Sequence, residues 1–236
     1  MAFHYSPKIV TDGLVFYVDS ANNKSYQIGT GIEYDLVGQQ DMILNNGVTY
    51  STDNLGCLVF DGINQFCEST SIYNTSESMT WDVWFNRSES VNDYNMILSH
   101  YSPYLSFRDV VGSNKFIISF YTRLSGVNTQ RTMVSNQSFL DNTWYNVSFT
   151  RQINVSNGSY DLKMYVNGEL EVTKSEVGVL DTMYQANDEL RIADHSSIGQ
   201  RYPFKGKIPS LKIYNKILSE DEIRQNYIAL KSRFGL

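Results

Sequence analysis

The sequence repeats one pattern along its length: short runs in which apolar and polar residues alternate. A period of two places successive side chains on opposite faces of a β-strand, so each run predicts a strand with one buried face. The clearest runs are residues 14–19, 57–60, 79–85, 96–100, 104–108, 115–121, 144–151, 161–166, 169–174, 189–193 and 210–214. Turn signals rich in Asn and Gly separate them, which favours an antiparallel sandwich of two sheets.

Two turns give sharper local predictions. Asn167-Gly168 stands between two alternating runs, and this pair is preferred in type I′ hairpin turns because both central residues need positive φ. The segment 57–67, CLVFDGINQFC, predicts a second hairpin around Asp61-Gly62. Its cysteines, Cys57 and Cys67, are expected to be free thiols, although the turn register leaves a disulfide open.

The run 79–85, MTWDVWF, predicts which residues form the core. Met79, Trp81, Val83 and Phe85 share one face of the strand and are expected between the two sheets. Trp84 then lies on the outer face, where it needs a cover from the C-terminal segment or from a partner.

The C-terminal residues predict a helix over 219–233. Ser219 followed by Glu222 is the signature of a capping box, which satisfies two backbone amides of the first turn. An apolar stripe follows at i, i+4, i+7 and i+11, formed by Ile223, Tyr227, Leu230 and Phe234. We expect this stripe to dock on a sheet face or on a neighbouring subunit.

No linker, repeat or charge block divides the chain. We therefore expect an extended arm at residues 1–12, followed by a single domain at residues 13–236 that includes helix 219–233. The 236 residues carry a net charge of −6, so they have no basic surface for nucleic acid or for an anionic membrane. The opening residues, MAFHYSPKIVTDG, lack the apolar core of a secretion signal, which predicts synthesis in the cytoplasm without a signal peptide.

Motifs for catalysis or metal binding are missing from the sequence. Glu-x-Asp-x-x-Glu, which would place paired carboxylates on one strand, does not occur, nor do GxSxG, HExxH or GxxxxGK[ST]. Two cysteines and three widely spaced histidines do not make a structural zinc site. The sequence predicts a non-enzymatic protein without a cofactor or metal.

Several segments, in order, resemble concanavalin A-like lectin/glucanase domains of the laminin-G-like type. CLVFDGINQFCE is similar to their S-L-x-F-D-G-x-N-D-Y hairpin and MTWDVWF to their F-T-x-E-x-W-F strand. TWYNVSFTR with LKMYVNGEL is similar to W-Y-H-V-x-x-T…L-Y-V-N-G, and FKGKIPSLKIYNKILSEDEI to the family's F-x-G-x-I ending. The resemblance implies an all-β, two-sheet antiparallel jelly-roll sandwich with an extended N-terminal arm and one C-terminal α-helix.

The opening, DGLVFYVDSANNKSY, and the ending, NYIALKSRFGL, look most like the versions found in tailed-phage virion proteins. This resemblance implies a non-enzymatic virion surface protein, either a capsid decoration or a fibre or tail appendage. Its partners would be other virion subunits, including copies of itself, and a host-surface glycan. Two alternatives stay open: a structural virion cement without sugar binding, and a polysaccharide-degrading enzyme with an atypical site.

A glycan site is expected in loops at one end of the sandwich, because sugar rings stack on aromatic side chains while polar groups orient them. The resemblance implies that the loops SHYSPY and ADHSSIGQRY approach each other at a rim. The candidate glycan-binding residues are His100, Tyr101, Tyr104, Asp194, His195, Arg201 and Tyr202. A structural calcium at this rim stays open through Asp194, but residues 100–103 supply no carboxylate to support it.

Overall fold

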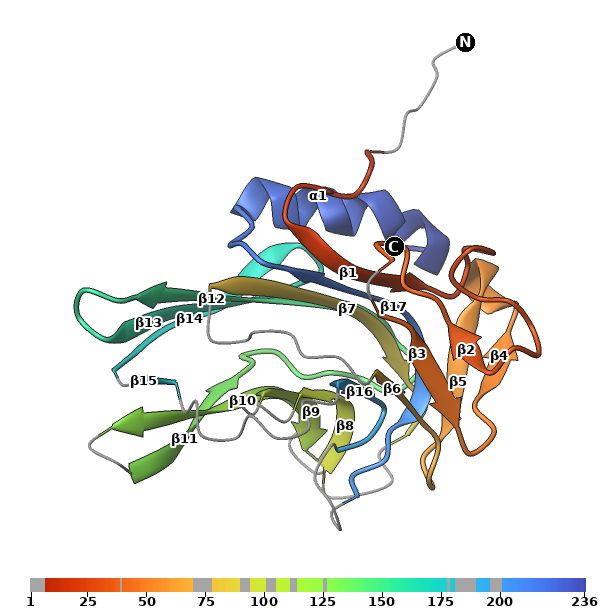
Figure 1. The fold of residues 1–236 in the computed structure, drawn as a ribbon, viewed down its shortest axis with the longest axis horizontal. Coiled ribbons are helices and arrows are strands. Elements are labelled where there is room, and N and C mark those ends of the chain that lie inside the picture. Colours follow the sequence, from red (N-terminus) through yellow and green to blue (C-terminus); the bar gives the residue numbers. More distant parts are fainter. Residues whose placement is uncertain are drawn as a thin grey trace.

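The computed structural model describes residues 7–38, 40–69, 78–89, 94–100, 105–110, 114–124, 127–177, 179–180, 190–195 and 201–236. Two antiparallel β-sheets lie face to face, and one C-terminal helix covers the outer face of one of them (Figure 1). The predicted two-sheet sandwich with a single C-terminal helix is confirmed. Among the described residues, no helix has the length and apolar character needed to cross a membrane.

The helix-covered layer, sheet A, has the strand order β14-β13-β12-β7-β17-β5-β4, and β1 also pairs with β17. The strands are β1 (Leu14–Asp19), β4 (Thr49–Ser51), β5 (Cys57–Asp61), β7 (Met79–Arg87), β12 (Trp144–Asn154), β13 (Ser159–Val166), β14 (Glu169–Val177) and β17 (Lys205–Tyr214). The long strands β7, β12 and β17 lie side by side at its centre.

The other layer, sheet B, has the order β11-β10-β9-β8-β16-β6-β3-β2, and β15 also pairs with β10. The strands are β2 (Ile32–Glu33), β3 (Met42–Asn45), β6 (Phe66–Ser69), β8 (Tyr94–His100), β9 (Leu105–Val110), β10 (Lys115–Leu124), β11 (Val127–Val134), β15 (Val179–Leu180) and β16 (Leu190–Ile192). A short 3₁₀ turn, η1 (Asp53–Leu55), precedes β5.

The core between the sheets follows the period-two pattern of β7. Met79, Trp81, Val83 and Phe85 are all buried in it, as predicted from their shared face. Aromatic rings from sheet B complete the layer: Phe116 stacks on Phe85 with a centroid separation of 5.5 Å. Burial of side chains of this size supplies most of the stabilisation of a sandwich.

The Asn-Gly hairpin is confirmed in detail. Asn167 has φ 53° and Gly168 φ 79°, and the turn joins β13 to β14 with Val166 opposite Glu169. Gly168 is required for a second reason: a Cβ at this position would lie 3.0 Å from the Tyr227 side chain. The turn is therefore also part of the surface on which the C-terminal helix packs.

The predicted hairpin at 57–67 is wrong. β5 pairs with β17 and β4 in sheet A, whereas β6 pairs with β16 and β3 in sheet B, so the DGIN turn crosses from one sheet to the other. The corner is held by Gln65, whose side chain accepts from Asp61 N at 3.0 Å and donates to Gly47 O at 2.8 Å. Cys57 and Cys67 therefore belong to opposite sheets; both are buried, free thiols.

The C-terminal helix, α1 (Glu220–Lys231), begins with the predicted capping box. Ser219 Oγ accepts from Glu222 N at 3.2 Å, and the Glu222 carboxylate accepts from Ser219 N at 2.8 Å. A 3₁₀ turn, η2 (Ser232–Phe234), continues the helix. The helix lies along the outer face of sheet A (Figure 1).

Trp84 is covered by this C-terminal segment. Its indole is fully buried and stacks on Phe234, with ring centroids 4.3 Å apart, and on Tyr227 at 5.6 Å. Ile223 is fully buried, whereas Leu230 is only half-buried. The apolar stripe thus docks on this chain's own sheet face, one of the two predicted outcomes.

Polar side chains lie beneath the helix as well. Lys212 Nζ is 2.7 Å from Asp82 Oδ1, and both side chains are fully buried. Ser148 Oγ and Asn146 Nδ2 donate to the other Asp82 oxygen at 2.8 and 3.2 Å. A buried ion pair is tolerated only with such additional hydrogen bonds, because each charge has lost its hydration.

The described part of the predicted arm, residues 7–12, packs against the helix. Val10 N donates to Asn226 Oδ1 at 2.8 Å, and Tyr214 OH donates to Val10 O at 3.0 Å. Asn226 Nδ2 in turn donates to Tyr214 OH at 3.0 Å. Asn226, fully buried in the helix, therefore helps to satisfy the backbone of a segment about two hundred residues away in sequence.

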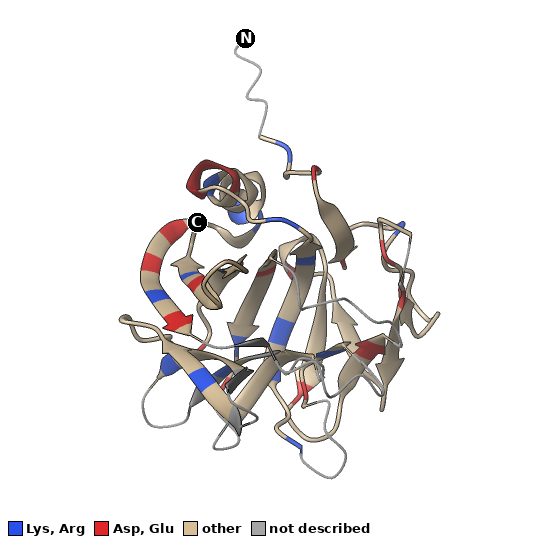
Figure 2. Ribbon diagram, turned by 60° about the vertical axis from the view of Figure 1, so that its left-hand side comes forward, with Lys and Arg blue, Asp and Glu red and all other residues tan. Residues whose placement is uncertain are grey.

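Charges of both signs are mixed over the described ribbon (Figure 2). The edge strand β14 carries Glu169, Glu171, Lys174 and Glu176. Lys174 Nζ donates to Thr132 O of β11 at 2.9 Å, which links the neighbouring edges of the two sheets. Charged residues on an edge strand oppose pairing with other chains.

Candidate functional site

Asp194 organises the loop that follows β16. Its side chain is 1% exposed, and Oδ1 accepts from the backbone N–H groups of His195 and Tyr202, each at 2.8 Å. Oδ2 accepts from Arg201, at 2.9 Å from Nε and 2.7 Å from Nη2. One carboxylate thus joins the two described ends of this loop, 190–195 and 201–204, and fixes their separation.

Two guanidinium groups lie over the ring of Phe66 in β6. The Arg191 guanidinium carbon is 4.7 Å from the ring centroid and that of Arg201 is 5.5 Å away. Arg191 is also bound by Glu68, at 3.1 Å from Nη2, and it donates from Nη1 to His195 O at 3.2 Å. These contacts hold a flat aromatic and cationic surface in place, since cation–π attraction adds to the ion pairs.

His195 and Tyr202 complete the cluster. Their rings meet edge to face with centroids 5.5 Å apart; the His195 side chain is buried and Tyr202 is half-buried. Burial lowers the pKa of His195 to about 4; Asp194 opposes this shift, while Arg108 and Arg191 reinforce it. The imidazole is therefore neutral at pH 7 and acts as a packing and hydrogen-bonding group.

A family model described as the concanavalin A-like lectin/glucanases superfamily matches residues 61–224. The chain belongs to this superfamily. Its lectin-like jelly-roll fold is therefore established by the family match together with the sheet topology. A search of curated proteins finds no match.

Solved structures with the same fold include toxin domains and an enzyme. The chain is similar to the binding domain of botulinum neurotoxin DC in complex with rat synaptotagmin II, with TM-score 0.66 and 14% identity over 92% of this chain and 52% of that one. The botulinum neurotoxin serotype D binding domain gives TM-score 0.64 and 14% identity, over 92% and 51%. Trypanosoma rangeli sialidase gives TM-score 0.68 and 13% identity, over 95% and 34%.

These identities show a shared fold and no more. The chain spans about half the length of the toxin domains and about a third of the sialidase. Function within this superfamily has to be argued from the site, because one fold supports many activities.

Four of the predicted site residues come together in this superfamily member: Asp194, His195, Arg201 and Tyr202. We call these four, with Phe66, Glu68 and Arg191, the Asp194 rim. His100 is a correction: it is fully buried and its ring faces Trp81 in the core at 6.1 Å. It pairs with the buried Leu190, so the strand places it on the inner face. Tyr101 and Tyr104 lie outside the described residues.

Sequence reasoning missed Phe66, Glu68 and Arg191. A local signal existed for the first two, because they flank the buried Cys67 in β6 and so share the outer face of sheet B. Arg191 reaches them only through the pairing of β16 with β6, which places it opposite Glu68. The pairing of β16 with β6 cannot be predicted from the spacing of residues in the sequence.

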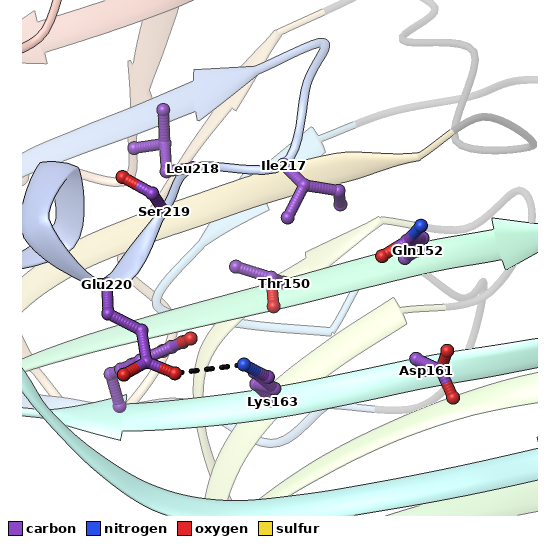
Figure 3. A pocket seen from close by; sticks show the side chains of 9 residues that line it. Thr150, Gln152, Asp161, Lys163, Ile217, Leu218, Ser219 and Glu220 are labelled. Carbon is purple, nitrogen blue, oxygen red and sulfur yellow. Dashed lines mark hydrogen bonds and ion pairs between the residues drawn. The ribbon is translucent and has the colours of Figure 1, made fainter.

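A separate hollow of about 150 Å³ lies on the outer face of sheet A, beside the start of α1 (Figure 3). Thr150 and Gln152 of β12 and Lys163 of β13 line it from the sheet, and Glu220 of α1 lines it from the helix. Lys163 Nζ and Glu220 Oε1 are 2.9 Å apart. This hollow and the Asp194 rim are on different sheets.

Metal ligands are not grouped in the described residues: no three of His, Cys, Asp and Glu are close enough there to hold an ion. Asp194, the residue through which a calcium stayed open, has both carboxylate oxygens occupied by N–H donors of its own loop. The described part of the rim therefore offers calcium none of the carboxylate-rich shells it prefers.

Proposed function

We propose that this chain is a non-enzymatic virion surface protein, a capsid decoration or a fibre or tail appendage, whose lectin-like domain binds a host-surface glycan at the Asp194 rim. One observation carries the proposal: the buried Asp194 carboxylate holds Arg201 over the Phe66 ring and fixes the backbone of Tyr202, whose ring packs against His195. The rim thereby combines aromatic faces and fixed donors on one rigid loop base.

The rim suits a sugar because a sugar has both apolar ring faces and hydroxyl groups. Phe66 and Tyr202 are half-buried, so both side chains are partly accessible to a ligand at this surface. The Arg201 side chain is 46% exposed, and its Nη1 makes no hydrogen bond within the described part of the chain, which leaves N–H donors for a ligand. Because these groups are already fixed, binding loses little conformational entropy.

The virion role rests on the resemblance of the opening and closing segments to tailed-phage proteins, and on the arrangement of the fold. Residues 7–12 and 232–236 lie on the α1 side of sheet A, whereas the rim belongs to sheet B (Figure 1). A protein assembled into a particle through its α1 side, with copies of itself and other virion subunits, would direct the rim outward. It would be made in the host cytoplasm before assembly.

A second function, a virion cement without sugar binding, is favoured by exposed apolar residues close to the rim. Ile63 is 72% exposed and adjoins Asn64, whose carbonyl accepts from Arg201 at 2.9 Å. Ile43 is 46% exposed and lies opposite Glu68 in the β3–β6 ladder. Apolar side chains grouped at a surface are typical of protein–protein contacts.

The deciding experiment is a glycan array and a host-cell adsorption assay with purified protein. We expect binding by the wild type, a loss of tenfold or more in Arg201→Gln and Tyr202→Ala, and no loss in Arg224→Gln. Arg224 is a matched control because it is an arginine of similar exposure on α1, paired with Glu169. Thermal melting checks that each variant is folded.

Two results would overturn the glycan role. A wild type that binds neither cells nor any glycan would refute it and would favour the cement function. Unchanged binding in folded Tyr202→Ala and Arg201→Gln would place the glycan site elsewhere on the molecule.

A further inference from the structure

We propose that the hollow beside the start of α1 is a second binding site, which takes a single neutral sugar ring or a similar cyclic polyol. It lies on sheet A and shares no residue with the Asp194 rim. The proposal does not depend on the rim, and the two can fail separately.

Three segments far apart in sequence build the hollow. Thr150 and Gln152 alternate on the outer face of β12, and they stand opposite Lys163 and Asp161 of β13. The segment leading into α1 adds Leu218 and closes the third side (Figure 3). The floor is therefore part of the rigid central sheet.

Thr150 supplies the observation that points to a ligand. It is 98% buried, since only 2% is exposed, and it lines the hollow. Its hydroxyl makes no hydrogen bond to another described residue, and the oxygen itself is not fully buried, so it is accessible from the hollow. A hydroxyl group that faces the hollow and has no protein partner offers a donor and an acceptor to an occupant that takes the place of water.

The cross-strand neighbour of Thr150 shows the contrast. Thr80 of β7 lies directly opposite it, on the same outer face. The Thr80 hydroxyl donates to Lys216 O at 2.8 Å and accepts from Leu218 N at 3.0 Å. One threonine of the pair is used to anchor the segment before α1, whereas the other is open to the hollow.

The charges around the hollow favour a neutral ligand over an anion. Lys163 is the one cation in its lining; Asp161 and Glu220 are both acidic. Lys163 and Glu220 are ion-paired, and their side chains are 39% and 59% exposed, so they stand at the mouth. Asp161 accepts from Ser175 and Asn154 at 2.7 and 2.9 Å, which fixes its orientation. Mixed donors and acceptors of this kind suit hydroxyl groups.

The size of the hollow suits one ring. A cavity of this volume, about 150 Å³, accommodates a six-membered ring such as benzene. Drug-sized ligands need more, on the order of 300–1,000 Å³. A polyol of so few atoms binds weakly, with a Kd in the millimolar range, and such a site becomes effective when many copies are arrayed.

The test is an amide-resolved NMR titration of the ¹⁵N-labelled full chain with four methyl hexopyranosides, with sodium sulfate as an anionic probe. We expect saturable shifts of the Thr150, Lys163 and Glu220 amides with at least one hexoside, and none with sulfate. Thr150→Val should remove these shifts while the melting temperature stays unchanged, because the hydroxyl makes no bond in the free protein. Arg201→Gln should leave them intact.

The proposal is overturned if no hexoside gives saturable shifts at these amides, if sulfate alone gives them, or if Thr150→Val responds like the wild type. Gln152→Leu provides a second variant, since Gln152 is exposed and its replacement does not disturb the core. If Arg201→Gln loses glycan-array binding but keeps the hexoside-induced shifts, the rim and the hollow are independent binding sites.

Discussion

Arg233 Nη1 lies 2.7 Å from Asp19 Oδ1, and both side chains are more than nine-tenths buried. Arg233 belongs to η2 and Asp19 is the last residue of β1, so this ion pair links the C-terminal 3₁₀ turn to the first strand of sheet A. Asn54 strengthens the joint by donating to Arg233 O at 2.9 Å. The pair keeps Phe234 of the same turn stacked on Trp84.

Replacement of Arg233 should therefore destabilise the whole fold. Arg233→Met leaves the Asp19 carboxylate buried without its cation, and we expect the free energy of unfolding to fall by about 3 kcal/mol in urea titrations. Arg224→Met is the control, since an exposed pair contributes less than ~1 kcal/mol. Equal effects of the two substitutions would show that the buried pair adds nothing.

Asn226 should control the attachment of residues 8–10. Asn226→Leu removes the acceptor for Val10 N, so we expect a loss of about 1–2 kcal/mol in stability and faster hydrogen exchange at the Val10 amide. Gln225→Ala is the comparison, because Gln225 is exposed and its side chain hydrogen-bonds to the Lys8 carbonyl. Unchanged exchange at Val10 in Asn226→Leu would contradict the role of Asn226.

Glu33 should make stability depend on pH. Its side chain is buried and accepts from Ser20 Oγ at 2.7 Å; burial raises its pKa from 4.5 to about 8. Between these values the folded protein keeps a proton that the unfolded chain has released, so stability falls as pH rises, by about 1.4 kcal/mol per unit.

His195 acts in the opposite direction at lower pH. Its pKa is about 4 in the folded protein against 6.5 when unfolded, so its effect on stability rises with pH between these values. The two effects oppose each other from pH 4.5 to 6.5. Urea unfolding from pH 6.5 to 8 should thus show a decline that Glu33→Gln removes. If Glu33→Gln shows the same decline in stability, a titratable group other than Glu33 causes it.

Both thiols should be slow to react in the native state. Burial raises the pKa of Cys57 and, more strongly, that of Cys67, so little thiolate forms near pH 7. A thiol reagent should titrate both cysteines only after denaturation without reductant. Titration of none, together with a mass two units low, would mean that a disulfide bridges the two sheets.

The proposed lack of enzyme activity is also testable. Each carboxylate of the Asp194 rim is bound by an arginine, Glu68 by Arg191 and Asp194 by Arg201, whereas glycoside hydrolysis needs one carboxyl group that donates a proton. We expect no release of reducing sugar from soluble β-glucans. Release that Asp194→Asn or Glu68→Gln abolishes would establish the enzymatic alternative.

The features predicted correctly from sequence depend on residues that are close to one another in the sequence. The Asn167-Gly168 turn, the Ser219 capping box and the alternation along β7 are all of this kind. Their physical causes, positive φ, unpaired first-turn amides and strand periodicity, act locally. Four residues of the rim could be predicted as well, although only through the family resemblance.

The errors arose where distant segments decide the outcome. The DGIN turn looks like a hairpin, yet β5 and β6 do not pair with each other: each has one partner far along the chain, β17 for β5 and β16 for β6. The orientation of His100 follows from its pairing with Leu190, which local pattern does not reveal. Asn226 and the Phe66–Arg201 contact likewise join parts of the chain well over a hundred residues apart.

Strand β17, Lys205–Tyr214, connects the segment after Tyr202 to the segment that leads into α1, and it is hydrogen-bonded to β1, β5 and β7, with an irregularity in the β7 pairing between Lys207 and Ser210. Tension applied between the rim and the α1 side acts along this strand. Its ladder hydrogen bonds are then loaded in shear and share the force, instead of opening one after another. If the molecule is held by its α1 side and loaded at the rim, as the proposed function implies, these bonds would keep the rim in place, and β17 would transmit the load as well as pack the core.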